Sequence, residues 1–205
     1  MKQLILVLLT LVPGYAWSQD NTWEQPEEDE TAIAKKKENP DAKYLKGAVP
    51  LVDGKVVFTT TIEAPGKTGP QIYAIIHQYL EKMTKEKNQM HSLIALEDST
   101  HWEVAGTFEE WLVFKSSALS LDRTRFYYVL AAKCHDGLAE LSLSRIHYLY
   151  DEQRSPQRYR AEEWITDKEA VNKKNTRLLP LSGKFRRKTV DRKNFLFNKI
   201  ESLLK

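Results

Sequence analysis

The alternation of apolar and polar positions predicts a chain that begins its fold with a strand followed by a helix. Residues 56–62 alternate between a more and a less apolar face, which is typical of a β-strand. Thr68 and Gln71 then form a capping-box pair with Pro70 in the first helical turn. The side chains that follow at helical spacing give one apolar stripe, so we expect this helix to lie on a surface. They are Ile72, Ile75, Ile76, Tyr79, Leu80 and Met83.

The pattern changes to a period of two from residue 92 to residue 150, which predicts four strands. The alternation places Phe108, Leu112 and Phe114 on one face and Trp111 on the other. An Asp-Gly turn separates the last two strands, and this arrangement favours an antiparallel meander. The predicted strands cover residues 93–96, 104–114, 123–134 and 138–150.

The C-terminal third predicts a long connection and a closing helix. An extended stretch at residues 162–165 holds Trp164, which we interpret as a structural anchor. Thr166 and Glu169 form a second capping pair, which predicts a short helix at residues 167–172. Pro180, Ser182 and Gly183 are predicted to break the chain before the final helix, whose apolar stripe begins at Phe185. That stripe continues through Leu196, Phe197, Ile200, Leu203 and Leu204.

A basic cluster occupies the first turns of this final helix, at Lys184, Arg186, Arg187 and Lys188. Positive charge at a helix N-terminus opposes the helix dipole, so these residues need negative neighbours. The sequence leaves two interpretations open. The cluster either pairs within the fold and with solvent, or it meets an acidic partner.

The first residues predict an export signal. Lys2 gives a short positive region, residues 4–12 give an apolar region, and Ala16 to Ser18 give a small-x-small cleavage site. We therefore expect a signal peptide at residues 1–18 and a periplasmic or secreted protein. The apolar run is too short for a membrane span and no cysteine lies near the cleavage site, so neither an integral membrane protein nor a lipoprotein is expected.

Composition divides the remaining chain into two parts. Residues 19–43 are acidic and then lysine-rich with almost no apolar periodicity, which predicts a flexible leader. Residues 44–205 then form a single domain, because the 205 residues, 41% of them hydrophobic, supply enough material for one core. The formal net charge of +3 does not by itself indicate a nucleic-acid partner.

No catalytic constellation is expected. Cys134, the single cysteine, and His135 are neighbours in a strand, so their side chains point to opposite faces. The five histidines lack metal-ligand spacing, and Glu162 and Glu163 diverge with no opposing acid. No phosphate-binding glycine loop or serine elbow is present. We therefore predict no enzyme activity, no metal and no cofactor.

Short motifs along the chain support a family resemblance. The most specific lie at residues 161–167 and 183–189, and others lie at 44–45, 47–50, 54–58, 65–67, 112–116, 118–125 and 145–150. Together they resemble a secreted, mostly Bacteroidota family that carries a domain of unknown function with a TBP-like fold. The resemblance spans roughly residues 43–204. It implies an α+β architecture of order β-α-β4-α, with a curved antiparallel sheet packed against two helices, but it implies no activity or site residues.

Two functional hypotheses follow. A curved sheet around a helix can hold an apolar molecule between its layers, so the first is a non-enzymatic binding module for an apolar or amphipathic ligand. Its candidate lining residues are Phe108, Phe114, Phe126, Tyr128 and Tyr148, which alternatively fill the core. The second is a cell-envelope interaction domain that meets an acidic partner through Lys184, Arg186, Arg187 and Lys188. Export removes the usual nucleic-acid partner.

Overall fold

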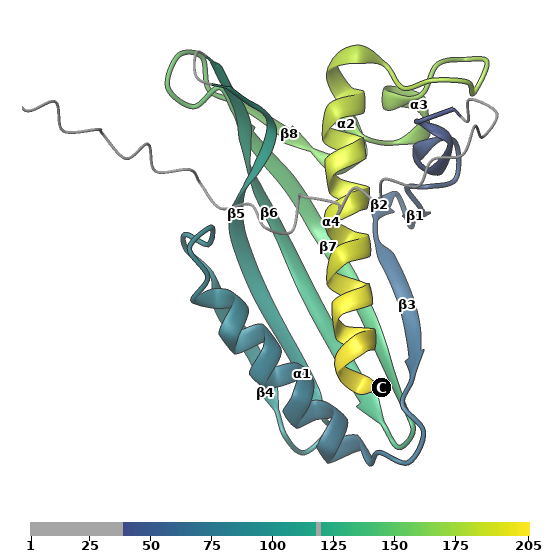
Figure 1. The fold of residues 1–205 in the computed structure, drawn as a ribbon, viewed down its shortest axis with the longest axis vertical. Helices are drawn as coiled ribbons and strands as arrows, with labels where there is room; N and C mark the ends of the chain where they lie inside the picture. The colour runs from purple at the N-terminus through teal and green to yellow at the C-terminus, as the bar shows by residue number, and fades with distance from the viewer. Residues whose placement is uncertain (1–38, 118–119) are drawn as a thin grey trace, which may run out of the picture.

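A curved antiparallel sheet is the frame of the molecule (Figure 1). In the computed structural model, which describes residues 39–117 and 120–205, its strand order is β3-β7-β6-β5-β4, and β8 pairs with β7. The predicted meander is confirmed, including the turn at Gly137, whose φ of 80° suits glycine. The strands are β3 (Phe58–Glu63), β4 (Leu93–Asp98), β5 (Glu103–Ser117), β6 (Ser120–His135), β7 (Leu138–Tyr150) and β8 (Gln157–Arg160).

Helix α1 (Gly69–Thr84) begins where the capping pair predicts. The backbone N–H of Thr68 donates to Oε1 of Gln71 at 2.9 Å. Four side chains of the predicted stripe are buried, namely Ile72, Ile76, Leu80 and Met83. Gly69 has a packing reason, because a Cβ atom at this position would lie 2.1 Å from the ring of Trp102.

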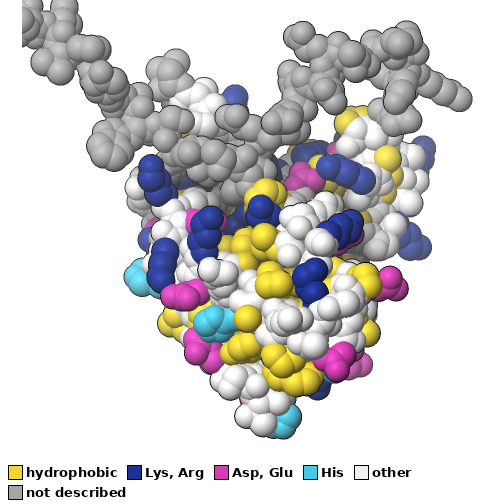
Figure 2. Space-filling view, turned by 60° about the horizontal axis from the view of Figure 1, so that its bottom comes forward, with side chains coloured by type: hydrophobic (Ala, Val, Ile, Leu, Met, Phe, Trp, Pro, Cys, Tyr) yellow, Lys and Arg dark blue, Asp and Glu magenta, His cyan; other side chains and the backbone are white. Residues whose placement is uncertain are grey.

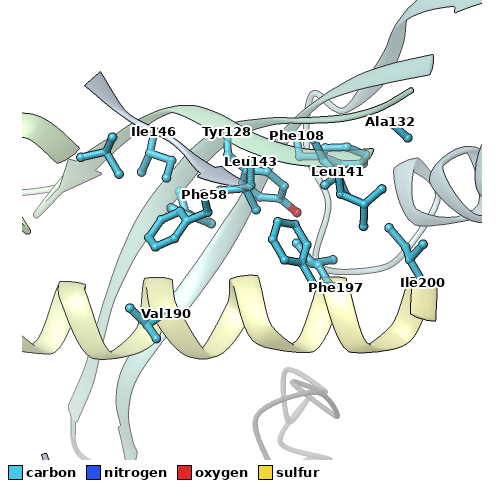
Figure 3. Packing of buried hydrophobic residues seen from close by; sticks show 14 of the residues in the cluster. Phe58, Phe108, Tyr128, Ala132, Leu141, Leu143, Ile146, Val190, Phe197 and Ile200 are labelled. Atoms are coloured by element: carbon cyan, nitrogen blue, oxygen red, sulfur yellow. The ribbon is translucent and has the colours of Figure 1, made fainter. Parts of the chain in front are cut away.

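Helix α4 (Pro180–Leu204) packs over the same sheet, and the two layers enclose the core. Figure 3 shows Val190, Phe197 and Ile200 of α4 pointing toward the sheet side chains Phe58 and Leu143. All five are buried. These buried side chains occupy the space between α4 and the sheet. Burial of each one contributes about 1.5–3 kcal/mol to folding.

The start of α4 differs from the prediction. Pro180 does not end the preceding segment; it occupies the first turn of the helix, where its missing N–H costs no hydrogen bond. Gly183 lies inside the helix. A larger residue would not fit there, because a Cβ atom at this position would approach Cβ of Leu178 to 2.7 Å. Close packing, and not a chain break, therefore accounts for this glycine.

The connection before α4 also differs. Residues 162–165 were expected to be extended, but α2 (Ala161–Trp164) is one helical turn, and the preceding residues form β8. The predicted short helix is present as α3 (Asp167–Ala170), with Thr166 as its N-cap residue. Strand β8 folds back on β7 as a hairpin, and its residues Gln157 to Arg160 show no apolar alternation that would predict a strand.

The structured region begins before Tyr44. Asp41 accepts a hydrogen bond from Arg187, and Lys43 pairs with Asp191 at 3.0 Å. Residues 39–43 are therefore attached to the domain, which corrects the predicted end of the leader at residue 43. The short elements here are η2 (Ala42–Tyr44), β1 (Leu51–Val52) and β2 (Lys55–Val56). The predicted signal peptide and residues 19–38 of the leader lie outside the described residues.

Arg186 fastens the N-terminal part of α4 to two segments, one at residues 44–45 and one at residues 165–167. Its side chain has no exposed surface. It donates to the carbonyl oxygens of Tyr44, Leu45 and Ile165 at 2.5, 2.6 and 2.7 Å and to Asp167 Oδ1 at 2.6 Å. Burial favours the neutral guanidinium and lowers the pKa of Arg186, while Asp167 acts in the opposite direction.

Lys67 fastens the other end of α4. Its Nζ donates to the carbonyl oxygen of Leu204 at 2.7 Å. The last carbonyls of a helix have no partner within the helix, and a lysine from another segment satisfies this one. Both ends of α4 are therefore held by side-chain hydrogen bonds.

We expect Arg186→Ala to reduce the free energy of unfolding by about 3–5 kcal/mol, because it leaves buried carbonyls and a carboxylate without their donor. Arg187→Ala is the matched control. Its side chain is 41% exposed, so a loss of no more than about 1 kcal/mol is expected. Urea denaturation of both variants measures the difference, and equal losses would contradict this account.

Candidate functional site

An open groove of about 830 Å³ lies between α1 and α4. Its apolar surface comes from Ile75 and Tyr79 of α1 and from Phe195 and Leu203 of α4. Phe195 is 38% exposed and Leu203 is 37% exposed, so this surface remains accessible to solvent. Figure 2 shows hydrophobic side chains gathered on this end of the molecule, with Lys and Arg side chains around them.

Helical periodicity explains why these side chains line a groove. On α4 the lining positions Arg192, Phe195, Lys199 and Leu203 repeat every three or four residues, so they form one stripe. The buried stripe of the same helix, which contains Leu196 and Ile200, faces the sheet instead. Each helix thus presents one face to the core and a neighbouring face to the groove.

A buried ion pair lies beneath the groove. Arg192 donates through Nε and Nη2 to the two carboxylate oxygens of Glu110 at 2.7 and 2.6 Å. Glu110 has no exposed surface and Arg192 is 1% exposed. Burial alone would lower the pKa of Arg192, but the charge of Glu110 raises it above its usual value. Gln89 adds a further donor to Glu110 at 2.6 Å.

Lysines exceed acids around the groove. Lys82, Lys85, Lys87 and Lys199 line it together with Glu81 and Glu86, and Lys85 pairs with Glu81 at 2.7 Å. Burial raises the pKa of Glu86, which favours its neutral form. Because Arg192 and Glu110 cancel each other, the four lysines and two glutamates leave a formal charge of +2.

The five aromatic residues predicted to line a ligand site belong to the core. Phe108, Phe126, Tyr128 and Tyr148 are at most 2% exposed, and Phe114 is partly buried. Their rings pack on one another; for example, the ring centroids of Phe108 and Tyr128 are 5.2 Å apart. None of the five lines the groove. Their inward direction follows from the strand period, but the packed sheet–helix interface leaves them no role as a ligand wall.

The predicted partner surface requires a correction. Arg186 is fully buried and cannot meet a partner. Lys184 donates to Asp122 Oδ2 at 2.7 Å and to the hydroxyl of Tyr150 at 3.0 Å, and Arg187 pairs with Asp41. Lys188 is half-buried. The acidic neighbours demanded by the helix dipole are thus mostly internal.

Trp164 packs as the predicted anchor position suggests. Its ring stacks on Tyr159 at a centroid distance of 3.9 Å and meets Phe185 edge-on at 5.9 Å. Cys134 is 1% exposed, and burial raises the pKa of its thiol to about 12, so it is protonated at neutral pH. Within residues 39–117 and 120–205, no group of three or more His, Cys, Asp or Glu side chains could hold a metal ion.

Sequence reasoning missed Glu110 and Arg192. A signal for Glu110 was present, since it lies between Phe108 and Leu112 on the inward face of a strand. A buried carboxylate requires a partner, which would have prompted a search for an inward-facing arginine. The identity of that partner depends on the packing of α4 and could not be read locally.

The neighbouring Glu109 organises a second polar cluster on the outer face of the sheet. Its side chain is 8% exposed and accepts hydrogen bonds from Arg125 at 2.6 Å, Tyr127 at 3.0 Å and His91 at 2.8 Å. Burial raises the pKa of Glu109, but these donors together lower it below its usual value. Tyr127 also stacks on His147, with ring centroids 4.4 Å apart.

The fold and its sheet order define an α+β protein of the TBP-like class. The family model described as "Domain of unknown function (DUF4468) with TBP-like fold" matches residues 58–149. A crystal structure of a DUF4468 family protein from Bacteroides ovatus is 41% identical with a TM-score of 0.76, and the match covers 82% of this chain and 96% of that chain. This chain therefore belongs to the DUF4468 family.

A second solved structure supports the fold alone. A TBP-like protein from Parabacteroides distasonis is 19% identical with a TM-score of 0.64, and the match covers 77% of this chain and 97% of that chain. A comparison with curated proteins found no match. Among the described residues, no helix is both long enough and apolar enough to cross a membrane.

Glu109 generates a prediction about acid stability. Its folded pKa is depressed, so the stability it contributes is complete above its unfolded pKa of about 4.3 and is lost as pH falls through the folded pKa. We expect Glu109→Gln to be less stable than the wild type by about 2 kcal/mol at pH 7, with the difference shrinking below about pH 4. Urea denaturation between pH 3 and pH 7 measures it.

The control is Glu140→Gln, because the side chain of Glu140 is 59% exposed. Its effect should stay within about 0.5 kcal/mol at every pH. A Glu109→Gln difference that does not change with pH would show that the ionised carboxylate is not what stabilises this cluster.

Proposed function

We propose that this protein is an exported, non-enzymatic binding module that takes a single-chain anionic amphiphile in the groove between α1 and α4. The observation that carries the proposal is the accessible apolar surface of Leu203 and Phe195 inside a lysine-rich groove of about 830 Å³. Ligand sites of this size combine apolar walls with a few polar groups that fix orientation. The groove has both components.

The apolar part of the groove suits a hydrocarbon chain. Ile75 and Tyr79 form one wall and Phe195 and Leu203 the other, so a chain lying along the groove would contact both helices. Transfer of such surface from water contributes roughly 25 cal/mol per Å², which makes an extended chain a better ligand than a compact polar molecule.

The charge of the groove selects the head group. The four lysines outnumber the two glutamates, and Lys85 already neutralises Glu81. A carboxylate head group would therefore gain attraction from Lys82 or Lys199, whereas a cationic head group would be repelled. The ion pair of Arg192 and Glu110 adds no net charge beneath the ligand.

This site replaces the one expected between the sheet and α4. That interface is filled by buried side chains such as Phe58 and Phe197, so an amphiphile would have to displace the core. The groove between α1 and α4 is open to solvent, so binding there displaces no core side chain. Export is supported by Lys2, the apolar residues 4–12 and the small residues Ala16 and Ser18.

Titration calorimetry with dodecanoate tests the proposal on the chain without residues 1–18. We expect saturable binding that Leu203→Ser weakens by roughly tenfold, because the substitution removes an apolar contact and introduces a hydroxyl. The matched control is Leu181→Ser in the same helix, since Leu181 is 51% exposed and does not line the groove. It should bind as the wild type does.

Two further arms separate head-group selection from general adhesion. Lys82→Glu combined with Lys199→Glu should weaken dodecanoate binding, and dodecyltrimethylammonium should not compete with dodecanoate. The proposal fails if dodecanoate does not bind, or if Leu181→Ser weakens binding as much as Leu203→Ser does.

A further inference from the structure

A second pocket lies at a break in the pairing along one edge of β7. Residue Leu143 of β7 still pairs with Phe58 of β3, and His147 already pairs with Arg160 of β8. Between these two points, neither edge strand pairs with β7. A pocket of about 540 Å³ occupies this place, and its lining includes Lys55 and Arg160.

A β-bulge turns Arg145 into this pocket. Pairing between β6 and β7 shifts register from Tyr127 with His147 to Val129 with Ser144, so β7 contains an extra residue here. Arg145 has a φ of 54°, a left-handed conformation that residues other than Gly, Asn and Asp rarely adopt. Its exposed side chain lines the pocket while that of Ile146 is 2% exposed and joins the core.

A flat ring forms part of the lining. His147 lines the pocket, and Nδ1 of its ring lies 3.1 Å from the carbonyl oxygen of Arg145, to which it donates when protonated. The ring also stacks on Tyr127 at an interplanar angle of 1°. The imidazole is therefore held in one orientation beside the bulge.

Positive charge in this pocket is not balanced. Lys55, Arg145 and Arg160 line it with a single carboxylate, Glu162, which leaves a formal charge of +2 with His147 neutral. Glu162 accepts the backbone N–H of Val56 at 3.0 Å and lies 3.8 Å from Arg160, which also lies 3.7 Å from Glu163 outside the lining. The unbalanced charge is therefore that of Lys55 and Arg145. Among the described residues, no acidic side chain lies within ion-pair distance of Lys55 or Arg145.

We propose that this pocket is a binding site for a tetrahedral oxyanion, a phosphate or a sulfate group carried by a small molecule. Three cationic side chains from three separate elements surround one space, and a tetrahedral anion offers oxygens in enough directions to meet all three. A planar carboxylate offers only two. A strained residue that directs a guanidinium into a pocket is the kind of backbone outlier that occurs at binding sites.

This proposal is independent of the amphiphile groove. The pocket is formed by β2, β7 and β8 with α2, whereas the groove is formed by α1 and α4, and the two share no lining residue. A negative binding result at one site therefore says nothing about binding at the other, and each site is tested with its own variants.

The test is an NMR titration of the chain without residues 1–18 with inorganic phosphate, at ionic strength held constant with sodium chloride. We expect saturable shifts of the signals of Arg145, His147 and Tyr127. Arg145→Gly should weaken binding by at least roughly tenfold through loss of the charged donor. Glycine adopts the left-handed conformation without strain, so this variant should fold at least as stably as the wild type.

Lys55→Gln should also weaken phosphate binding, and Arg154→Gln is the control because the side chain of Arg154 is 88% exposed and does not line the pocket. Sulfate should compete with phosphate and acetate should not. The proposal is overturned if Arg145→Gly binds phosphate as the wild type does, if Arg154→Gln weakens binding equally, or if acetate competes as well as sulfate. The variants Arg145→Gly and Lys55→Gln should bind dodecanoate as the wild type does, because neither residue lines the groove between α1 and α4.

Discussion

The ion pair between Glu110 of the sheet and Arg192 of α4 fixes how the two layers meet. Both side chains are buried, and both oxygens of the carboxylate are engaged by the guanidinium. A buried pair of this kind adds little net stability, but removing one partner leaves an uncompensated charge. The pair therefore acts mainly as a constraint on the rotation of α4 about its axis. That rotation decides which stripe of α4 enters the core and which stripe faces α1.

The order of elements could be predicted from the sequence because local signals set it. The capping pair of Thr68 and Gln71, the period of two in the long strands and the Asp-Gly turn all act over a few residues. The site could not be predicted in the same way. The direction of Arg186 and the partner of Arg192 are set by segments far away in the chain, such as Tyr44 and Glu110. A charged residue on a helix is usually solvated, but both of these arginines are buried.

The basic character of the C-terminal third is largely used inside the molecule. Lys184, Arg186 and Arg187 hold the β5–β6 end of the sheet, the α2–α3 connection and the segment before Tyr44, through Asp122, Asp167 and Asp41. Unbalanced positive charge is found elsewhere, in the groove between the helices and at the bulge of β7. A count of charges along the sequence therefore identifies the wrong surface, because it cannot separate charges that serve the fold from charges that face solvent.

The anchors at the two ends of α4 have a consequence for the binding kinetics of the proposed amphiphile site. Arg186 holds the helix near its beginning and Lys67 holds its last carbonyl, so its distance from α1 is set before any ligand arrives. A cleft whose walls are fixed in this way needs no opening step. Its association rate should rise in proportion to ligand concentration without reaching a plateau, and its selectivity for chain length should come from the fixed spacing of its walls.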